Sequence, residues 1–122
     1  MVSRPTLEFV AGIVAAGVVA GGLSLHVATP YALAVGLAAG TPALVRTSTR
    51  LDRDAYDAAK SETEQVVDGA VAAGATLVLG LAAGYVAVSG GYEGAIAAAA
   101  AAAFGVLGGQ FAFYARNRDY VD

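Results

Sequence analysis

The stretch Ala95–Gly105 reads AIAAAAAAAFG and contains seven consecutive alanines without a charged side chain. Alanine has the highest helix propensity of all residues, so this stretch predicts a helix. A helix at the surface of a soluble domain carries charged residues on its outer face, yet none occurs from Gly94 to Ala115. An uncharged helix of this length is typical of a membrane span.

The composition of the whole chain agrees with a membrane location. Of the 122 residues, 57% are hydrophobic and 14% are charged, whereas about 25% of residues are charged in soluble domains. Two more uncharged runs extend from Phe9 to Val45 and from Gly69 to Tyr92. The lack of cysteine excludes disulfide bonds and thiolate metal sites. The abundance of Ala, Val and Gly, with arginine favoured over lysine, resembles proteins from salt-loving archaea.

The three uncharged runs predict four spans. The first run is too long for one span and is interrupted by SLHVATP, in which Thr29 can cap a new helix and Pro30 suits its first position. Ser61 and Glu64 match the S-x-x-E capping box at the start of another helix. We therefore predict spans at residues 7–25, 30–47, 62–88 and 93–115. Each has about 18 residues or more, as a ~30 Å hydrocarbon core requires.

The basic residues predict the orientation of these spans. In a four-span arrangement all of them fall on one side of the membrane, and the short connections on the other side contain none. By the positive-inside rule, both termini and the loop at residues 48–61 are cytoplasmic. The basic residues are Arg4, Arg46, Arg50, Arg53, Lys60, Arg116 and Arg118.

Together these features predict an all-α integral membrane protein in which residues 1–122 form a single membrane domain. We expect a four-transmembrane-helix bundle made of two helical hairpins, with cytoplasmic N and C termini. We expect its location to be the cell membrane as a multi-pass protein, or a viral or vesicle membrane derived from it.

Glycine pairs spaced four residues apart occur in every predicted span. Lipid tails are as apolar as the side chains, so helices associate through close backbone contact, which small residues permit. The alanines at residues 97–103 would let neighbours approach their span from several directions, although codon bias alone would also produce such a run. The glycines that we expect at helix contacts are Gly17, Gly21, Gly36, Gly40, Gly80, Gly84, Gly105 and Gly109.

The ionisable residues within the spans lie near the cytoplasmic ends. Glu8 is close to the start of the first span and Asp68 is close to the start of the third, so both could approach each other or Arg46. Charges within a membrane often mark a transport path, but acids at helix ends with access to water are the simpler interpretation. Gln110 is the one amide inside a span, and we expect it to form an interhelical hydrogen bond.

The sequence contains no motif for catalysis, cofactor binding or metal binding. His26 is the single histidine and lies in an outer connection, where it provides neither a metal site nor a catalytic triad. We therefore expect no enzymatic activity, no metal and no cofactor.

The loop at residues 48–61 mixes basic and acidic residues, which argues against a polybasic lipid-binding patch. Leu51, Ala55, Ala58 and Ala59 predict the apolar side of a short amphipathic helix. We expect a solvated helical connection, with the docking of a partner as the alternative.

Two functional hypotheses remain. The leading one is a small non-catalytic subunit or packing protein of a larger membrane assembly, which associates through its Gly/Ala-rich helix faces. The alternative is a homo-oligomeric small channel, pore or transporter, with a polar or ion-binding seam that involves Glu8, Asp68 and Gln110, with Thr76. The expected partners are membrane lipid and other membrane protein subunits or copies of the chain itself, and no nucleic acid.

Overall fold

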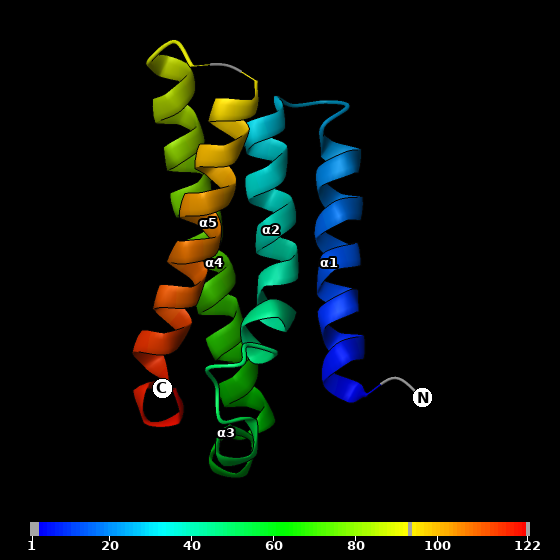
Figure 1. Cartoon of the computed structure of the whole chain (residues 1–122), viewed down its shortest axis with the longest axis vertical. Coiled ribbons are helices and arrows are strands. Elements are labelled where there is room, and N and C mark those ends of the chain that lie inside the picture. Colours follow the sequence, from blue (N-terminus) through cyan, green and yellow to red (C-terminus); the bar gives the residue numbers. More distant parts are fainter. Residues whose placement is uncertain (1–2, 93, 122) are drawn as a thin grey trace.

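The computed structural model describes residues 3–92 and 94–121 of the chain. This part folds into four long helices that alternate in direction, with a short helix at one end (Figure 1). Among the described residues, α1, α4 and α5 are long and apolar enough to cross a membrane. The described chain is therefore helical with three candidate spans, as expected for a helical membrane protein. The elements are α1 (Arg4–Leu23), α2 (Thr29–Arg46), α3 (Arg53–Ala59), α4 (Glu62–Ser89), α5 (Ala95–Arg116) and the 3-10 helix η1 (Arg118–Tyr120).

Helix α2 occupies the centre of the bundle. It packs against α1 on one side and against α4 and α5 on the other, whereas α1 packs mainly against α2 (Figure 1). Helix α2 buries seven residues, but α1 buries only Gly12 and Ala16. Helix α2 is also the least apolar of the four long helices and is not among the candidate spans. Its lower apolar content agrees with its central position, where neighbouring helices cover much of its surface.

The predicted cap forms at the start of one helix and not at the start of another. At α4 the predicted capping box forms: Ser61 Oγ accepts from the Glu64 N–H at 3.2 Å, and Glu64 Oε1 accepts from the Ser61 N–H at 3.1 Å. At α2 the predicted cap is wrong by one residue. Ala28 precedes the helix without a side-chain hydrogen bond, and Thr29 is the first helical residue.

The ends of the predicted spans differ from the helices by a few residues. Helix α1 begins at Arg4, where Ser3 Oγ accepts a hydrogen bond from the Thr6 N–H at 3.3 Å. The predicted start of the fourth span at Glu93 lies outside the described residues, and α5 begins at Ala95.

The connection between α2 and α4 folds under the bundle instead of extending into solvent. Its helix α3 places the fully buried ring of Tyr56 against Phe113 of α5, with the ring centroids 5.7 Å apart. The backbone N–H of Asp52 donates to the carbonyl oxygen of Tyr120 at 2.7 Å. The segment that follows α5 therefore holds this connection in place.

The predicted apolar side of this connection is wrong in part. Leu51 is buried as expected, but Ala58 and Ala59 are exposed and Ala55 is only half-buried. Tyr56 is the residue that α3 turns inward. A tyrosine can bury its ring if its hydroxyl finds a hydrogen-bond partner, and an alanine offers much less area.

Glycines of α2 form its crossing with α1. A Cβ added to Gly36 would lie 2.7 Å from the Cβ of Ala20, and a Cβ added to Gly40 would lie 3.2 Å from the Cβ of Ala16. A larger side chain at either position would push the helices apart. Comparable close approaches to neighbouring helices occur at Gly80, Gly84, Gly105 and Gly109.

The glycine pair of α1 lies on a different face from this crossing. A Cβ added to Gly17 or Gly21 would have no neighbouring atom within 4 Å in the described part of the chain. Helix α1 meets α2 through Gly12, Ala16 and Ala20 instead. The contact between α1 and α2 therefore uses small residues other than the predicted glycine pair.

Candidate functional site

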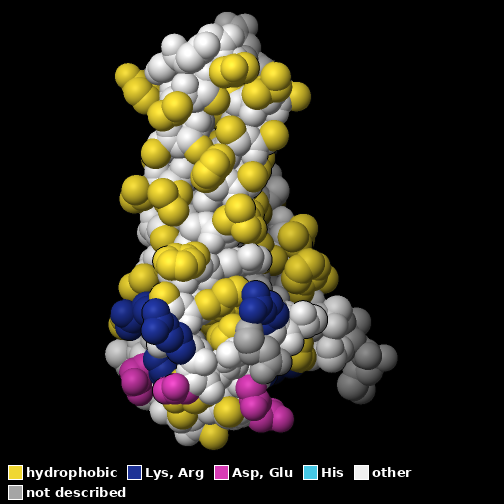
Figure 2. Space-filling view, turned by 60° about the vertical axis from the view of Figure 1, so that its left-hand side comes forward, with side chains coloured by type: hydrophobic (Ala, Val, Ile, Leu, Met, Phe, Trp, Pro, Cys, Tyr) yellow, Lys and Arg dark blue, Asp and Glu magenta, His cyan; other side chains and the backbone are white. Residues whose placement is uncertain are grey.

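The basic residues gather at one end of the bundle, which we call the charged end. It is formed by the start of α1, the end of α2, α3, the start of α4 and the end of α5 with η1. On the face that Figure 2 presents, lysine, arginine, aspartate and glutamate side chains cluster at this end, and apolar side chains are spread over the rest among other side chains and backbone atoms. Six of the seven basic residues of the sequence belong to these segments or the loop before α3, and the seventh, Lys60, directly follows α3.

Asp68 is the centre of one ion cluster at the charged end. Its side chain is fully buried, and its Oδ1 accepts a hydrogen bond from Nε of Arg116 at 2.9 Å. Its Oδ2 accepts from the hydroxyl of Tyr56 at 3.0 Å and from Nζ of Lys60 at 3.2 Å. These three donors come from α3, the residue after it, and α5. A buried carboxylate is tolerated when it is paired and hydrogen-bonded in this way, so Asp68 ties the three segments together.

The hydroxyl of Tyr56 is held in its neutral form. Burial raises the pKa of this phenol, and the hydrogen bond to the Asp68 carboxylate raises it further. A phenolate beside a carboxylate would add a second negative charge in a buried place, so the proton stays on the tyrosine. Tyr56 therefore acts as a hydrogen-bond donor to Asp68.

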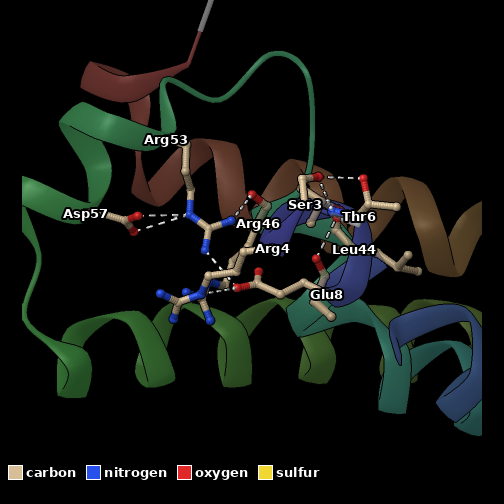
Figure 3. Close-up of polar contacts among 10 residues, drawn as sticks. Ser3, Arg4, Thr6, Glu8, Leu44, Arg46, Arg53 and Asp57 are labelled. Atoms are coloured by element: carbon tan, nitrogen blue, oxygen red, sulfur yellow. Dashed lines mark hydrogen bonds and ion pairs between the residues drawn. The ribbon is translucent and has the colours of Figure 1, made fainter. Parts of the chain in front are cut away.

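Arg53 is the centre of a second ion cluster, which Figure 3 shows in close-up. Its Nη2 donates to Oε1 of Glu8 at 3.0 Å, and its Nη1 donates to the backbone carbonyl of Arg46 at 3.0 Å. Its Nε lies 3.1 Å from Oδ2 of Asp57. The hydrogen bond to Glu8 raises the pKa of the Arg53 guanidinium. One side chain of α3 thus joins α1 and α2 at the charged end.

The two acids predicted to approach each other share no partner. Glu8 is bound by Arg53 and, at 3.6 Å, by Arg4, whereas Asp68 is bound by Lys60 and Arg116. The predicted approach of Glu8 to Asp68 is therefore not formed. Arg46 attracts Glu8 electrostatically, although the described structure shows no ion pair between their side chains.

A polar layer lies between the helices farther from the charged end. The Thr41 hydroxyl donates to Oγ1 of Thr76 at 3.0 Å, and Thr76 is fully buried. Gly109 of α5 faces this pair, and a side chain at that position would collide with the Thr76 hydroxyl. The side-chain amide of Gln110 forms no hydrogen bond with the described residues, so the interhelical bond that we expected is not made among them.

Gln110 instead lines an open cavity of about 430 Å³ between α1, α2 and α5. Phe9 and Ile13 of α1 form one wall, and Leu37 of α2 and Val106 of α5 also contribute. The polar side chains of the lining are Thr41, Thr47, Ser48, Thr49 and Gln110. The lining therefore combines one amide residue and four hydroxyl residues with an apolar wall, and the hydroxyls of Thr41, Thr47 and Ser48 form hydrogen bonds within the chain.

No cluster of three or more metal-binding side chains of the His, Cys, Asp and Glu types occurs in residues 3–92 and 94–121. His26 is exposed in the connection between α1 and α2. The two ion clusters are thus the main gatherings of charged groups in the described structure.

The partners of the two acids were not identified from the sequence. The orientation pattern places every basic residue at the same end as Glu8 and Asp68, which narrows the candidates to seven. Which of these basic residues bind each acid depends on where α3 lies under the bundle, and no local sequence pattern predicts that position. Tyr56 gave no signal, because a single tyrosine in a charged loop matches no motif.

No protein-family model matches the chain, and neither the curated proteins nor the solved structures include a significant match to it.

Proposed function

We propose that this chain is a non-catalytic helix-packing subunit of a larger membrane assembly, and that α1 provides its main contact with the neighbouring subunit. In this proposal all four long helices cross the membrane, and the charged end faces the cytoplasm. The antiparallel packing of α2 along α1 supports a span at α2, because the two helices then occupy the same layer. The positive-inside rule supports the orientation.

The observation that carries the proposal is the uncovered face of α1. Helix α1 packs mainly against α2, and added Cβ atoms at Gly17 and Gly21 would meet nothing within 4 Å in the described chain. Val14 and Val18, on either side of Gly17, are 55% and 68% exposed. Glycines four residues apart with β-branched neighbours allow two backbones to approach closely, as in right-handed membrane helix pairs. This face is therefore suited to a helix from another chain.

Gln110 supports the same proposal from a second helix. Its amide is inside an apolar span and has no hydrogen-bond partner among the described residues. Polar side chains within a membrane usually bind across helix interfaces. Because Gln110 lines the cavity beside α1, a helix seated on that side would cover both the glycine pair and the amide.

The ion clusters argue against transport by the single chain. Asp68 is fully buried and receives three hydrogen bonds, so an ion that replaced them would have to break the contacts between α3, α4 and α5. Glu8 is likewise engaged by Arg53. Acids with such partners are better suited to stabilising helix contacts than to binding and releasing ions.

One observation favours the second candidate, a homo-oligomeric small channel or transporter. The cavity between α1 and α5 has a lining that contains an amide and four hydroxyls. If a copy of the chain covered this cavity, these groups would form a polar seam between protomers. Of the residues that we predicted for such a seam, Gln110 lines this cavity and Thr76 is buried in a hydrogen bond with Thr41, whereas Glu8 and Asp68 lie in the ion clusters.

Native purification followed by mass spectrometry tests the proposal. We expect the chain to copurify with one or more other membrane proteins, and the variant Gly17→Leu/Gly21→Leu to lose them. Gly74→Leu is the matched control, because Gly74 is an exposed glycine of α4 whose added Cβ also meets nothing within 4 Å in the described chain. Recovery of a uniform particle that holds one copy of the chain alone would overturn the proposal. A particle made of several copies would favour the second candidate.

A further inference from the structure

A second groove lies on the opposite side of the α1–α2 pair, at the charged end. It has a volume of about 480 Å³ and lies between α1, α2 and α4. Its apolar lining consists of Pro42 of α2 with Val66, Gly69 and Ala70 of α4. Its polar lining consists of Arg4, Arg46, Glu62 and Gln65. The groove therefore combines an apolar wall with two guanidinium groups.

Arg46 is the unusual member of this lining. Its Nε is buried and has no hydrogen-bond partner in the described part of the chain. Its backbone carbonyl is used by Arg53, but its guanidinium donates no hydrogen bond to any described residue. A buried N–H without an acceptor is costly, and a guanidinium offers five such donors in a planar fork. The carboxylate oxygen Glu8 Oε2 is also buried without a hydrogen-bond partner, but no hydrogen bond joins it to Arg46 in the described structure. The Arg46 guanidinium can therefore still bind an acceptor, preferably one with a negative charge.

Arg4 can supply a second cation to the same place. Its side chain is 85% exposed, and its Nε is 3.6 Å from Glu8, whereas Arg53 binds the same oxygen at 3.0 Å. Glu8 is thus already neutralised by Arg53, which leaves Arg4 able to turn toward the groove. Two arginines and one glutamate, Glu62, give the lining a net charge of 2 − 1 = +1. One phosphodiester would neutralise it.

We propose that this groove binds an anionic phospholipid, with the phosphate on Arg46 and Arg4 and one acyl chain along Pro42, Val66 and Ala70. Arginine matches phosphate oxygens through paired, charge-assisted hydrogen bonds. Basic pockets between helices at the membrane surface are places where acidic lipid headgroups bind. This inference requires only that the charged end lies at a membrane surface, and it is independent of the partner that covers α1.

The shape of the groove favours a lipid over free phosphate. Val66 is 71% exposed, and Ala70 is exposed one turn farther along α4, away from the charged end. A free anion would use the arginines and leave this apolar strip uncovered. A lipid would cover the strip with its chain and place its headgroup on the guanidinium groups.

Native mass spectrometry of the full chain in a non-ionic detergent tests this proposal. The probes are phosphatidylglycerol and phosphatidylcholine with identical acyl chains, and inorganic phosphate. We expect phosphatidylglycerol to bind about tenfold more tightly than phosphatidylcholine, and Arg46→Gln to weaken its binding about tenfold, as the loss of a charged hydrogen bond predicts. Arg118→Gln is the matched control, because Arg118 is exposed at the same end and outside this groove. We expect its effect to stay within about twofold.

The variant Ala70→Phe separates the lipid from the ion and tests the groove even if Arg46→Gln fails to fold. It fills the apolar strip without a change of charge, so it should weaken the binding of phosphatidylglycerol. Equal losses in Arg46→Gln and Arg118→Gln would overturn the proposal, because they would indicate a diffuse charge effect. Binding of inorganic phosphate at concentrations comparable to those of the lipid, unaffected by Ala70→Phe, would overturn the assignment to a lipid.

Discussion

The Nε atom of Arg116 lies 2.9 Å from Oδ1 of Asp68 and joins the end of α5 to the start of α4. The Asp68 side chain is fully buried, whereas 43% of the Arg116 side chain is exposed. The carboxylate is thus enclosed by the bundle, and the arginine closes it off from the outside. This geometry makes Asp68 a fastening point for α5.

Asp68→Asn should destabilise the folded chain by about 3 kcal/mol, at the low end for a broken buried ion pair. The loss is at the low end because the exposed Arg116 can turn to water when its partner is removed. Denaturant unfolding in detergent, followed by circular dichroism, measures the difference. Asp54→Asn on α3 removes the same charge from an exposed position and should change stability by less than about 0.5 kcal/mol. Equal effects of the two variants would contradict the fastening role.

Tyr56 should make stability depend on alkaline pH. Its pKa is raised, so the folded chain keeps this proton where an unfolded phenol, with a pKa of about 10, has lost it. The contribution of Tyr56 is then fully present below about pH 10 and is lost as the pH rises through the folded-state pKa.

The variant Tyr56→Phe isolates this contribution. It should lower the free energy of unfolding by about 2 kcal/mol at neutral pH, because the hydrogen bond to Asp68 is lost. From about pH 10 upward its stability should fall less steeply than that of the original chain. Denaturant unfolding at a series of pH values checks both effects. Parallel curves for the two proteins would show that Tyr56 ionises normally when folded.

In the alanine run of α5, larger side chains should be tolerated only on the exposed side of the helix. Ala97 and Ala101 are fully buried, and Ala101 lies where Gly80 and Gly84 of α4 approach α5, whereas Ala99 is exposed. Ala101→Leu should therefore destabilise the chain by about 1–3 kcal/mol through overpacking. Ala99→Leu should stay within about 0.5 kcal/mol. Thermal unfolding in detergent compares the two variants. Equal tolerance at both sites would indicate that the alanine run reflects codon bias and has no role in helix packing.

The proposed orientation can be tested with single cysteines, because the chain has none of its own. Ser89 at the end of α4 and Ala58 in α3 are both exposed and lie at opposite ends of the bundle. An impermeant thiol reagent should label Ser89→Cys in intact cells and Ala58→Cys only after lysis. The reverse result would invert the orientation, and equal labelling of both would indicate insertion in two directions.

The helices could be predicted where residues close together in the sequence determine them. The capping box of Ser61 and Glu64 involves residues three apart, and the uncharged runs specify apolar segments directly. Which side of a helix faces its neighbour is not local. Gly17 and Gly21 match a packing motif, yet α2 lies against Gly12 and Ala16, and the spacing of the small residues is the same in both pairs.

The site was less predictable than the fold for a similar reason. Glu8 and Asp68 could be selected because charges are rare in the spans. One hydrogen-bond partner of each comes from α3, Arg53 for Glu8 and Tyr56 for Asp68, and the position of α3 under the bundle could not be predicted. Arg46 could be selected from the sequence as one of the basic residues that define the orientation and as a residue that the two acids could approach. Its lack of a hydrogen-bond partner becomes evident only when the surrounding side chains are placed.

The spacing of the Asp68 partners along the chain has a consequence for synthesis. Lys60 and Tyr56 are 8 and 12 residues before Asp68, so both have left the ribosome when Asp68 does. Arg116 is separated from Asp68 by 48 residues and follows only after α4 and α5 have been made. During synthesis, Asp68 must therefore be made before its partner Arg116 is available to bind it. The ion cluster of Asp68 can be completed only after α5 has been made.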